Sequence, residues 1–209
     1  STVTVFLGLR ESPQSLGFAG ENHWYFDGYD HDRLRDRRPE TLEGNPPMAL
    51  GSFPSLKDPE ASSHTAEIIT FLPAGLFDAW REQPWRRRGE DYDLLKARIA
   101  RGLIDLVERH HPGFRDLVVF EEVSTPLTIE QFSGHPAGQI YGIPSTPARL
   151  REGLVPAKTD LPGLLLTGAD VCAPGVAGAL MGGVFAAAAA MGPTGYARIM
   201  REVRALDPS

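Results

Sequence analysis

The sequence is short of cysteine and of positive charge. Cys172 is the single cysteine among 209 residues, which excludes an intramolecular disulfide framework and any metal site built from several cysteines. Lys and Arg number 21 against 27 for Asp and Glu, so the formal net charge is −6. A general nucleic-acid-binding protein neutralises phosphates with basic side chains, so this balance argues against nucleic acid as a partner. A reducing compartment is compatible with this cysteine usage, and we expect a cytoplasmic protein.

The sequence also lacks a recognisable signal peptide and a convincing transmembrane segment. It opens with TVTVFLGL, without a basic region or a cleavage site. Residues 171–191 are uncharged and long enough to consider as a membrane span. However, Gly and Ala dominate this stretch and Pro174 lies near its start, so it offers little apolar surface to lipid. We instead predict a buried helix packed tightly against its neighbours, because glycines let backbones approach closely.

The first part of the chain, residues 1–124, has the pattern of an α+β domain. The clearest helix is expected at 91–111, where Tyr92, Leu95 and Ile99 follow a spacing of three to four residues. The other expected elements are strands at 2–9, 22–27, 48–55, 64–73 and 114–123, a short helix at 76–83, and an exposed loop at 28–47. We therefore expect a mixed sheet accompanied by helices.

The second part, residues 125–209, has a different composition. A short helix is expected at 127–134, followed by a stretch rich in Gly and Pro. The apolar run LLLTG at 164–168 is typical of a strand that is covered on both faces. Helices are expected at 176–191 and 193–205.

A lone carboxylate, Asp170, lies between this apolar run and the glycine-laced segment that follows. In α/β sheets, ligands bind outside the carboxyl ends of the strands. The N–H groups of Val176, Ala177 and Gly178 would point from a helix N-terminus toward an anion or an electron-rich oxygen, and Gly175 would permit close approach. Asp170 would then accept hydrogen bonds from ligand hydroxyls. The alternative is that Asp170 only caps the helix or the turn.

Three segments together resemble a known family. GLLLTGADVCAPGVAGALMGG is similar to the C-terminal flavin motif of the phytoene desaturase, carotenoid isomerase and retinol saturase group of FAD-dependent oxidoreductases. STPLTIEQFSGHPAGQIYGI at 124–143 is similar to the segment that precedes that motif in the family. SFPSLKDP at 52–59 with HTAEIITF at 64–71 resembles the retinol saturase branch.

The resemblance implies FAD as the cofactor and an apolar polyene or isoprenoid as the substrate. The reaction would be the desaturation, saturation or isomerisation of carbon–carbon bonds. Residues 1–124 would be the substrate-binding domain, and residues 125–209 would contribute the C-terminal strand and helix of a Rossmann-like FAD-binding domain. Asp170 would contact the ribityl chain, and the backbone at Val176 and Ala177 would face the pyrimidine edge of the flavin. The glycines of this FAD site would be Gly168, Gly175 and Gly178.

One feature of the family is missing. Its FAD-binding domain begins with a strand, a GxGxxG turn and a helix, and no GxGxxG occurs in this sequence. We therefore expect a C-terminal portion of such an enzyme, with an incomplete FAD site, which needs an N-terminal FAD-binding half as its partner. We predict that these 209 residues alone neither hold FAD tightly nor catalyse the reaction.

Two other functions stay open. One is an amine-oxidase-like flavoenzyme, and the other is a non-catalytic lipid-binding or interaction module. The basic run Arg86-Arg87-Arg88 is interpreted as solvated surface; with the flanking Trp80 and Trp85 it also suits peripheral contact with a membrane.

Several single residues are interpreted as structural rather than functional. Cys172 is interpreted as a small buried side chain and Tyr141 as a packed aromatic one. His110 and His111 end a helix, and no further ligands beside them indicate a metal site. No side chain is nominated as a catalytic acid or base.

Overall fold

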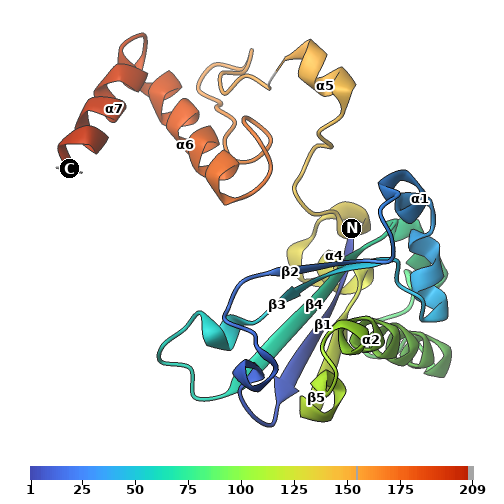
Figure 1. The fold of residues 1–209 in the computed structure, drawn as a ribbon. Coiled ribbons are helices and arrows are strands. Elements are labelled where there is room, and N and C mark those ends of the chain that lie inside the picture. Colours follow the sequence, from blue (N-terminus) through green and yellow to red (C-terminus); the bar gives the residue numbers. More distant parts are fainter. Residues whose placement is uncertain (154, 207–209) are drawn as a thin grey trace. The chain divides into compact units, whose positions relative to one another are not determined.

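The computed structural model describes residues 1–153 and 155–206. The described chain divides into two compact units, the first comprising Ser1–Ile140 and the second beginning at Tyr141. The β-sheet belongs to the first unit, and the helices near the C-terminal end of the chain belong to the second (Figure 1).

The first unit is built on a five-stranded sheet in the order β2-β3-β4-β1-β5. The strands are β1 (Thr2–Leu9), β2 (His23–Phe26), β3 (Met48–Ser52), β4 (His64–Phe71) and β5 (Val118–Ser124). All four neighbouring pairs are antiparallel, so the prediction of a mixed sheet is wrong. The long connection from β4 leads to β5, which runs in the same direction but is separated from β4 by β1. The helical connection therefore joins two parallel strands that are not neighbours in the sheet.

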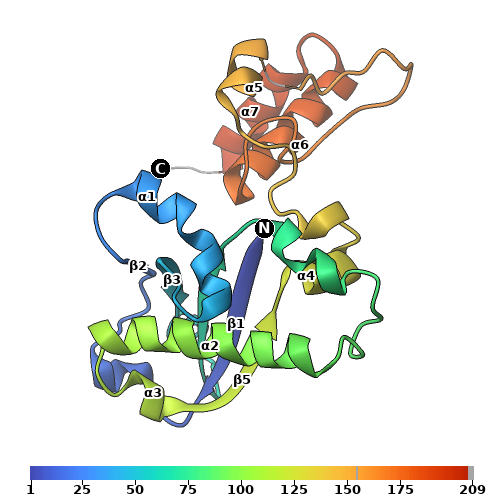
Figure 2. The same cartoon turned by 90° about the vertical axis from the view of Figure 1, so that its right-hand side faces the viewer.

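The crossover helix is α2 (Glu90–His110), close to the range that the periodicity predicts. Its apolar side recurs every three to four residues and packs into the main hydrophobic core. The buried residues of α2 include Leu95, Ile99, Leu103 and Val107, and they share the core with Val3 and Val5 of β1. Figure 2 shows α2 crossing the strands on one face of the sheet.

The predicted exposed loop at 28–47 is wrong in part, because it contains two helical segments. These are α1 (His31–Asp36) and a 3₁₀ helix (Arg38–Glu43). Asp30 caps α1 by accepting a hydrogen bond from the N–H of Arg33 at 3.0 Å. Leu34 and Thr41 are buried, so a largely polar segment still covers the core.

Short helices make most of the remaining connections in the first unit. Further 3₁₀ helices are Pro13–Leu16, Pro54–Leu56, Ala74–Trp80 and Pro136–Gly138; α-helices are α3 (Phe114–Leu117) and α4 (Pro126–Ser133). The segment 114–123, predicted as one strand, therefore begins with the turn of α3. The predicted helices at 76–83 and 127–134 are present, the first of them as a 3₁₀ helix.

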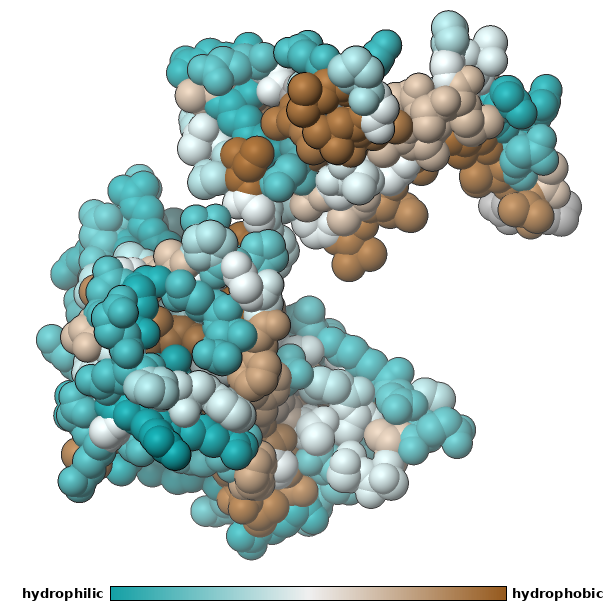
Figure 3. Space-filling view, turned by 180° about the vertical axis from the view of Figure 1, so that it is seen from behind, coloured by the Kyte–Doolittle hydropathy of each residue, from teal (hydrophilic) through white to brown (hydrophobic). Residues whose placement is uncertain are grey.

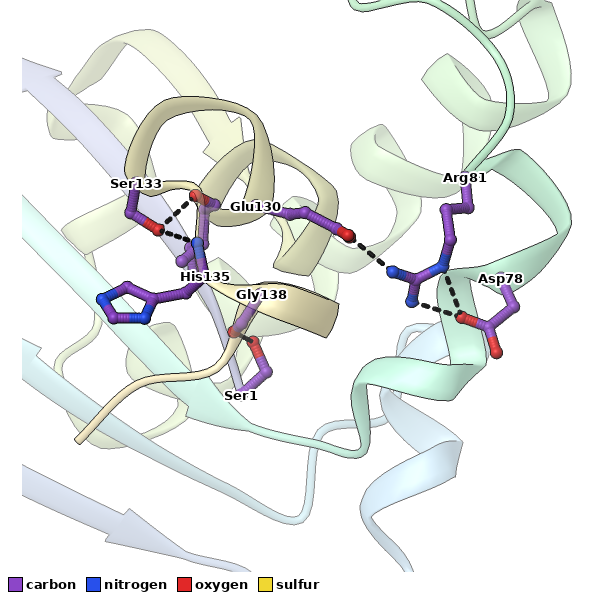
Figure 4. A network of polar contacts seen from close by, with 8 residues as sticks. Ser1, Asp78, Arg81, Glu130, Ser133, His135 and Gly138 are labelled. Carbon is purple, nitrogen blue, oxygen red and sulfur yellow. Dashed lines mark hydrogen bonds and ion pairs between the residues drawn. The ribbon is translucent and has the colours of Figure 1, made fainter. Parts of the chain in front are cut away.

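Polar contacts attach α4 and the segment after it to the first unit (Figure 4). Arg81 pairs with Asp78 and with Glu130 of α4, each at 2.6 Å. The Ser1 hydroxyl donates to the carbonyl of Gly138 at 2.5 Å. These contacts continue to residue 138, and the structural division falls at 140/141. The functional assignment of 1–124 and 125–209 stays a prediction.

The second unit is helical. It contains α5 (Pro147–Glu152), α6 (Val176–Met191) and α7 (Gly195–Leu206), and α6 packs against α7. The predicted ranges of the last two helices are confirmed to within two residues. The predicted strand at 164–168 is wrong: among the described residues it forms only an isolated bridge between Leu165 and Lys158, and Leu164 and Leu166 are exposed. A strand needs a paired neighbour, and the described part of this unit provides none.

Candidate functional site

The N-terminus of α6 is open. Its N-cap is Gly175, with φ 92°, and no side chain among the described residues caps it. Val176, the first helical residue, is 90% exposed. The first N–H groups of a helix have no partner within the helix. Those of Val176, Ala177 and Gly178 therefore face away from the helix body.

Small residues let this helix approach the preceding loop closely. A Cβ at Gly178 would overlap the carbonyl of Ala173, and a Cβ at Gly182 would overlap the carbonyl of Gly168. Gly168 itself has φ 86°, a left-handed conformation that favours glycine. Gly178 against Ala173 and Gly182 against Gly168 are thus two separate close contacts, which together hold the loop containing Asp170 beside the first turns of α6.

The Asp170 side chain has a partner that the sequence does not suggest. Its Oδ1 accepts a hydrogen bond from the N–H of Ile143 at 2.7 Å. The cap position of α6 belongs to Gly175, so Asp170 is not the helix cap that was one alternative. Because no hydrogen bond is formed by Oδ2 within the described residues, one carboxylate oxygen remains available to a ligand hydroxyl.

Arg149 also contacts this loop, although no pattern in the sequence marks it as a site residue. Its guanidinium donates to the carbonyl of Ile143 at 2.6 Å and to the carbonyl of Asp170 at 2.7 Å. The planar fork of an arginine suits two acceptors at once. Only the position of Arg149, two residues into α5 behind the capping Thr146, hints at an ordered side chain.

Tyr141 is not packed as predicted. It is 58% exposed and has φ 67°, and Gly142 follows with φ 70°. A left-handed conformation is uncommon for a residue with a side chain. The Asp170 carboxylate occupies the space in which a Cβ of Gly142 would lie, so the backbone turns at the carboxylate and leaves the tyrosine ring outside. Cys172, also in this unit, is half-buried.

The prediction that α6 is a buried helix is wrong within the described residues. Leu180 is exposed, and the residues of α6 that are buried are Gly178 and Gly182. The hydrophobic core cluster lies in the first unit, and Val171 is the one hydrophobic residue buried in the described part of the second unit. Figure 3 shows large hydrophobic areas on the surface of the second unit. Residues 141–153 and 155–206 therefore leave much of their apolar surface exposed.

The first unit carries an open apolar sheet face. On the face away from the core, strand alternation places Trp24, Phe26, Leu50, Ile69, Phe71, Phe6 and Phe120, which we call the apolar sheet face. Trp24 stacks with Phe26 and Phe71, at centroid distances of 6.0 and 6.2 Å. Trp24 and Phe120 remain more than half exposed. Thr4, Glu67 and Glu122 lie on the same face, as is normal for a solvated sheet face. The apolar side chains beside them form an exposed patch with the character of a binding surface.

The basic run 86–88 is only partly solvated surface, contrary to expectation. Arg86 and Arg87 are exposed, whereas Arg88 is buried, and its guanidinium carbon lies 5.4 Å from the centroid of the Tyr92 ring. Trp80 is not part of an aromatic and basic cluster with these arginines, because its indole N–H donates a hydrogen bond to Asp91 at 2.8 Å. The Arg86 guanidinium lies over the Trp85 ring, with a distance of 4.3 Å from its central carbon to the ring centroid.

Three histidines, His23, His110 and His111, lie close together at the C-terminal end of α2. His111 lies over Phe18 at a centroid distance of 4.3 Å, and His23 is 5.5 Å away. Burial, followed by the nearby charges of His23 and His110, lowers the pKa of His111. In the part of the chain that the structure describes, no group of three or more His, Cys, Asp or Glu residues is arranged to hold a metal ion. No helix in residues 1–153 and 155–206 has the length and apolarity to cross a bilayer.

The fold and the site together define a protein with an open apolar sheet and, in a separate unit, a glycine-rich helix N-terminus beside a carboxylate. No protein-family model matches the chain. It is 29% identical to the all-trans-retinol 13,14-reductase of Danio rerio over 196 residues, which cover 87% of this chain and 32% of the relative. The protein of that name from Homo sapiens is 27% identical, with 89% and 32% covered.

A third relative is named differently. A Danio rerio protein called inactive all-trans-retinol 13,14-reductase is 26% identical over 202 residues, which cover 90% of this chain and 33% of the relative. The resemblance to the retinol saturase branch is thus confirmed, and the chain is a homologue of these reductases. The chain spans about a third of the length of these relatives.

Proposed function

We propose that this chain is part of an FAD-dependent oxidoreductase that acts on carbon–carbon bonds of an apolar polyene or isoprenoid. The observation that carries the proposal is the open N-terminus of α6 beside Asp170. It supplies free N–H donors next to a carboxylate with one uncommitted oxygen. The printed names of the relatives support a retinoid as the substrate class.

The residues present fit part of a flavin. Asp170 can accept hydrogen bonds from ribityl hydroxyls through Oδ2, while Oδ1 keeps its bond to Ile143. The N-terminus of α6 would stabilise negative charge at the pyrimidine edge. When bound, FAD would supply the redox chemistry, which is the cofactor's own. The pyrophosphate cradle is missing from this sequence, so residues outside the 209 would complete the site.

The apolar sheet face suits the proposed substrate. A polyene offers almost no hydrogen-bonding groups, so its binding rests on burial of apolar surface. Stacked rings at Trp24, Phe26 and Phe71 give a flat aromatic surface of that kind. In this proposal, the first unit binds and orients the substrate and excludes water from it.

The exposed apolar surface of the second unit supports the proposal of a larger flavin domain. Leu164, Leu166 and Leu180 are open to solvent in this chain. The relatives are about three times as long as the matched region. We propose that an N-terminal FAD-binding half covers these side chains and brings the pyrophosphate site.

The test is the visible absorption spectrum of the longest natural form of the polypeptide, purified without added cofactor. Flavin bands, and FAD released on denaturation, would support the proposal, and turnover of all-trans-retinol would then test the substrate. Asp170→Asn keeps an acceptor for Ile143 and should lower the flavin content, whereas the exposed control Asp160→Asn should not. A colourless protein that ignores added FAD would overturn the proposal.

A non-catalytic role is the second candidate, and the relative named inactive favours it. In that case the polypeptide would bind an apolar ligand on the sheet face without converting it. Flavin that is bound, but is neither reduced nor reoxidised in the presence of retinoids, would favour this candidate.

A further inference from the structure

Arg88 is a largely buried cation that has no ion-pair partner among residues 1–153 and 155–206. It is 7% exposed, although it carries a permanent charge. Its Nε is buried without a hydrogen bond, and none of the ion pairs within residues 1–153 and 155–206 involves its guanidinium. Stacking over Tyr92 offsets part of the loss of hydration. Among the nitrogens of Arg88 only Nε is both buried and unpaired, so the terminal nitrogens reach the surface, where they are open to an anion.

A groove of about 410 Å³ opens at this guanidinium. It lies wholly within the first unit, between the start of α2, the strand β5 and the helix α4. Its lining residues include the cations Arg86, Arg88 and Lys96. Trp85, Tyr92 and Phe132 form aromatic walls, and Trp85 meets Phe132 edge to face at a centroid distance of 5.1 Å.

Two carboxylates, those of Asp93 and Glu122, also line the groove. Both also line a neighbouring hollow of about 300 Å³ along β5, which they share with Lys96 and Glu121 but not with Arg86 or Arg88. The acidic side chains therefore belong to the β5 end of the groove, and the two arginines to the other end. An anion at the arginine end would lie between Arg86, Arg88 and the aromatic walls.

We propose that this groove is a binding site for a phosphate group. Guanidinium groups donate several hydrogen bonds in a planar fork that matches phosphate oxygens, and charged hydrogen bonds of this kind are the strong ones. The aromatic walls would contact an apolar body attached to the phosphate. Trp85 and Phe132 are 40% and 68% exposed, so the rim is open to a soluble phosphate monoester and to the headgroup of an anionic lipid.

Arg87 provides a matched control for a test. It is exposed, it adjoins Arg88 in the chain, and it does not line the groove. Arg88→Gln and Arg87→Gln remove the same charge, so a general electrostatic attraction would respond equally to both. Arg86→Gln changes an exposed residue that does line the groove, and it tests the site even if Arg88→Gln fails to fold.

The first measurement is the unfolding temperature of the 209-residue chain in sodium phosphate, compared with sodium chloride at equal ionic strength. A ligand that binds only the folded state raises this temperature as its concentration rises. We expect phosphate to raise it. We also expect Arg88→Gln or Arg86→Gln to weaken the fitted affinity about tenfold, and Arg87→Gln to change it less than about twofold.

The second measurement separates the two sources of the phosphate. The chain is sedimented with phosphatidylcholine vesicles, with and without phosphatidic acid. Retention that needs phosphatidic acid, and that free phosphate reverses, would assign the groove to a lipid headgroup. A phosphate effect without retention would assign it to a soluble monoester. No phosphate effect and no retention would overturn the proposal, as would an equal loss in Arg87→Gln.

Discussion

The Asp170 carboxylate accepts the N–H of Ile143 at 2.7 Å and so joins two segments that lie 27 residues apart in the chain. The first segment contains the turn at Tyr141 and Gly142, and the second leads into α6. Arg149 binds the carbonyls of both partner residues. The loop at 141–143 is therefore fixed to the start of the helix through one carboxylate and one guanidinium.

Removal of the Asp170 carboxylate should release this loop. Asp170→Ala leaves the N–H of Ile143 without its acceptor, and a charged hydrogen bond contributes about 1.5–3 kcal/mol. We expect the Ile143 amide to exchange with solvent roughly tenfold faster or more, measured by hydrogen exchange with NMR detection. Asp160→Ala, which removes an exposed carboxylate of the same unit, should leave that rate unchanged. An equal rate in Asp170→Ala and in the unsubstituted chain would contradict the hydrogen bond.

Gly182 and Gly183 should respond in opposite ways to alanine. A Cβ at Gly182 would overlap the backbone carbonyl of Gly168, and overpacking of this kind costs about 1–3 kcal/mol. A Cβ at Gly183 would lie 3.9 Å from the Thr167 hydroxyl, an ordinary contact. Because alanine is the better helix former, Gly183→Ala should be neutral or stabilising by up to about 1 kcal/mol. Urea unfolding followed by the helical circular dichroism signal compares the two variants.

A second close approach, in the first unit, gives a similar prediction. Gly102 of α2 lies against the backbone carbonyl of Gly44, which a Cβ would overlap. Gly102→Ala should therefore lower the free energy of unfolding by about 1–3 kcal/mol, although alanine favours helices. Arg101→Ala, an exposed change on the same helix, should stay within about 0.5 kcal/mol of the original chain. A Gly102→Ala variant as stable as Arg101→Ala would show that Gly44 moves aside freely.

Local patterns predicted the long helix and the strands of the first unit, but not α1, α3 or most of the short 3₁₀ helices. The spacing of Tyr92, Leu95 and Ile99 predicts α2 because these side chains do pack on one core. The alternation in β1 likewise predicts a strand with Val3, Val5 and Leu7 buried. The direction of strand pairing was not predictable in this way, because the insertion of β1 between β4 and β5 leaves no mark in any single segment.

Residues whose structure depends on distant partners were not predictable from local patterns. The run at 164–168 is apolar enough for a buried strand, but a strand also needs a neighbour, and among the described residues only Lys158 bridges to it. The side chain of Arg88 is chemically like those of Arg86 and Arg87, and only the fold places it over Tyr92. At the candidate flavin site, composition indicates Asp170 and the glycines. The roles of Arg149 and Ile143 come from a turn that no periodicity describes.

His111 should make the stability of the first unit depend on pH. Burial, and then the charges of His23 and His110, hold its pKa below the ordinary value of 6.5. Between the two pKa values the unfolded chain binds more protons than the folded one, so the free energy of unfolding rises with pH. The stabilisation of the folded state by neutral His111 is fully present above about pH 6.5, the pKa of the unfolded chain. It is lost as the pH falls through the lower pKa of the folded state.

The variant His111→Phe tests this dependence, because it removes the titrating group and keeps a ring over Phe18. We expect the free energy of unfolding, measured in urea from pH 7.5 to 5, to fall less steeply for the variant than for the original chain. His135→Gln, which removes an exposed histidine, should keep the original slope. If His111→Phe kept that slope as well, the loss of stability in acid would have to come from other groups. The carboxylate of Glu108 would be examined next, because hydrogen bonds from the N–H groups of Arg115 and Gly113 lower its pKa.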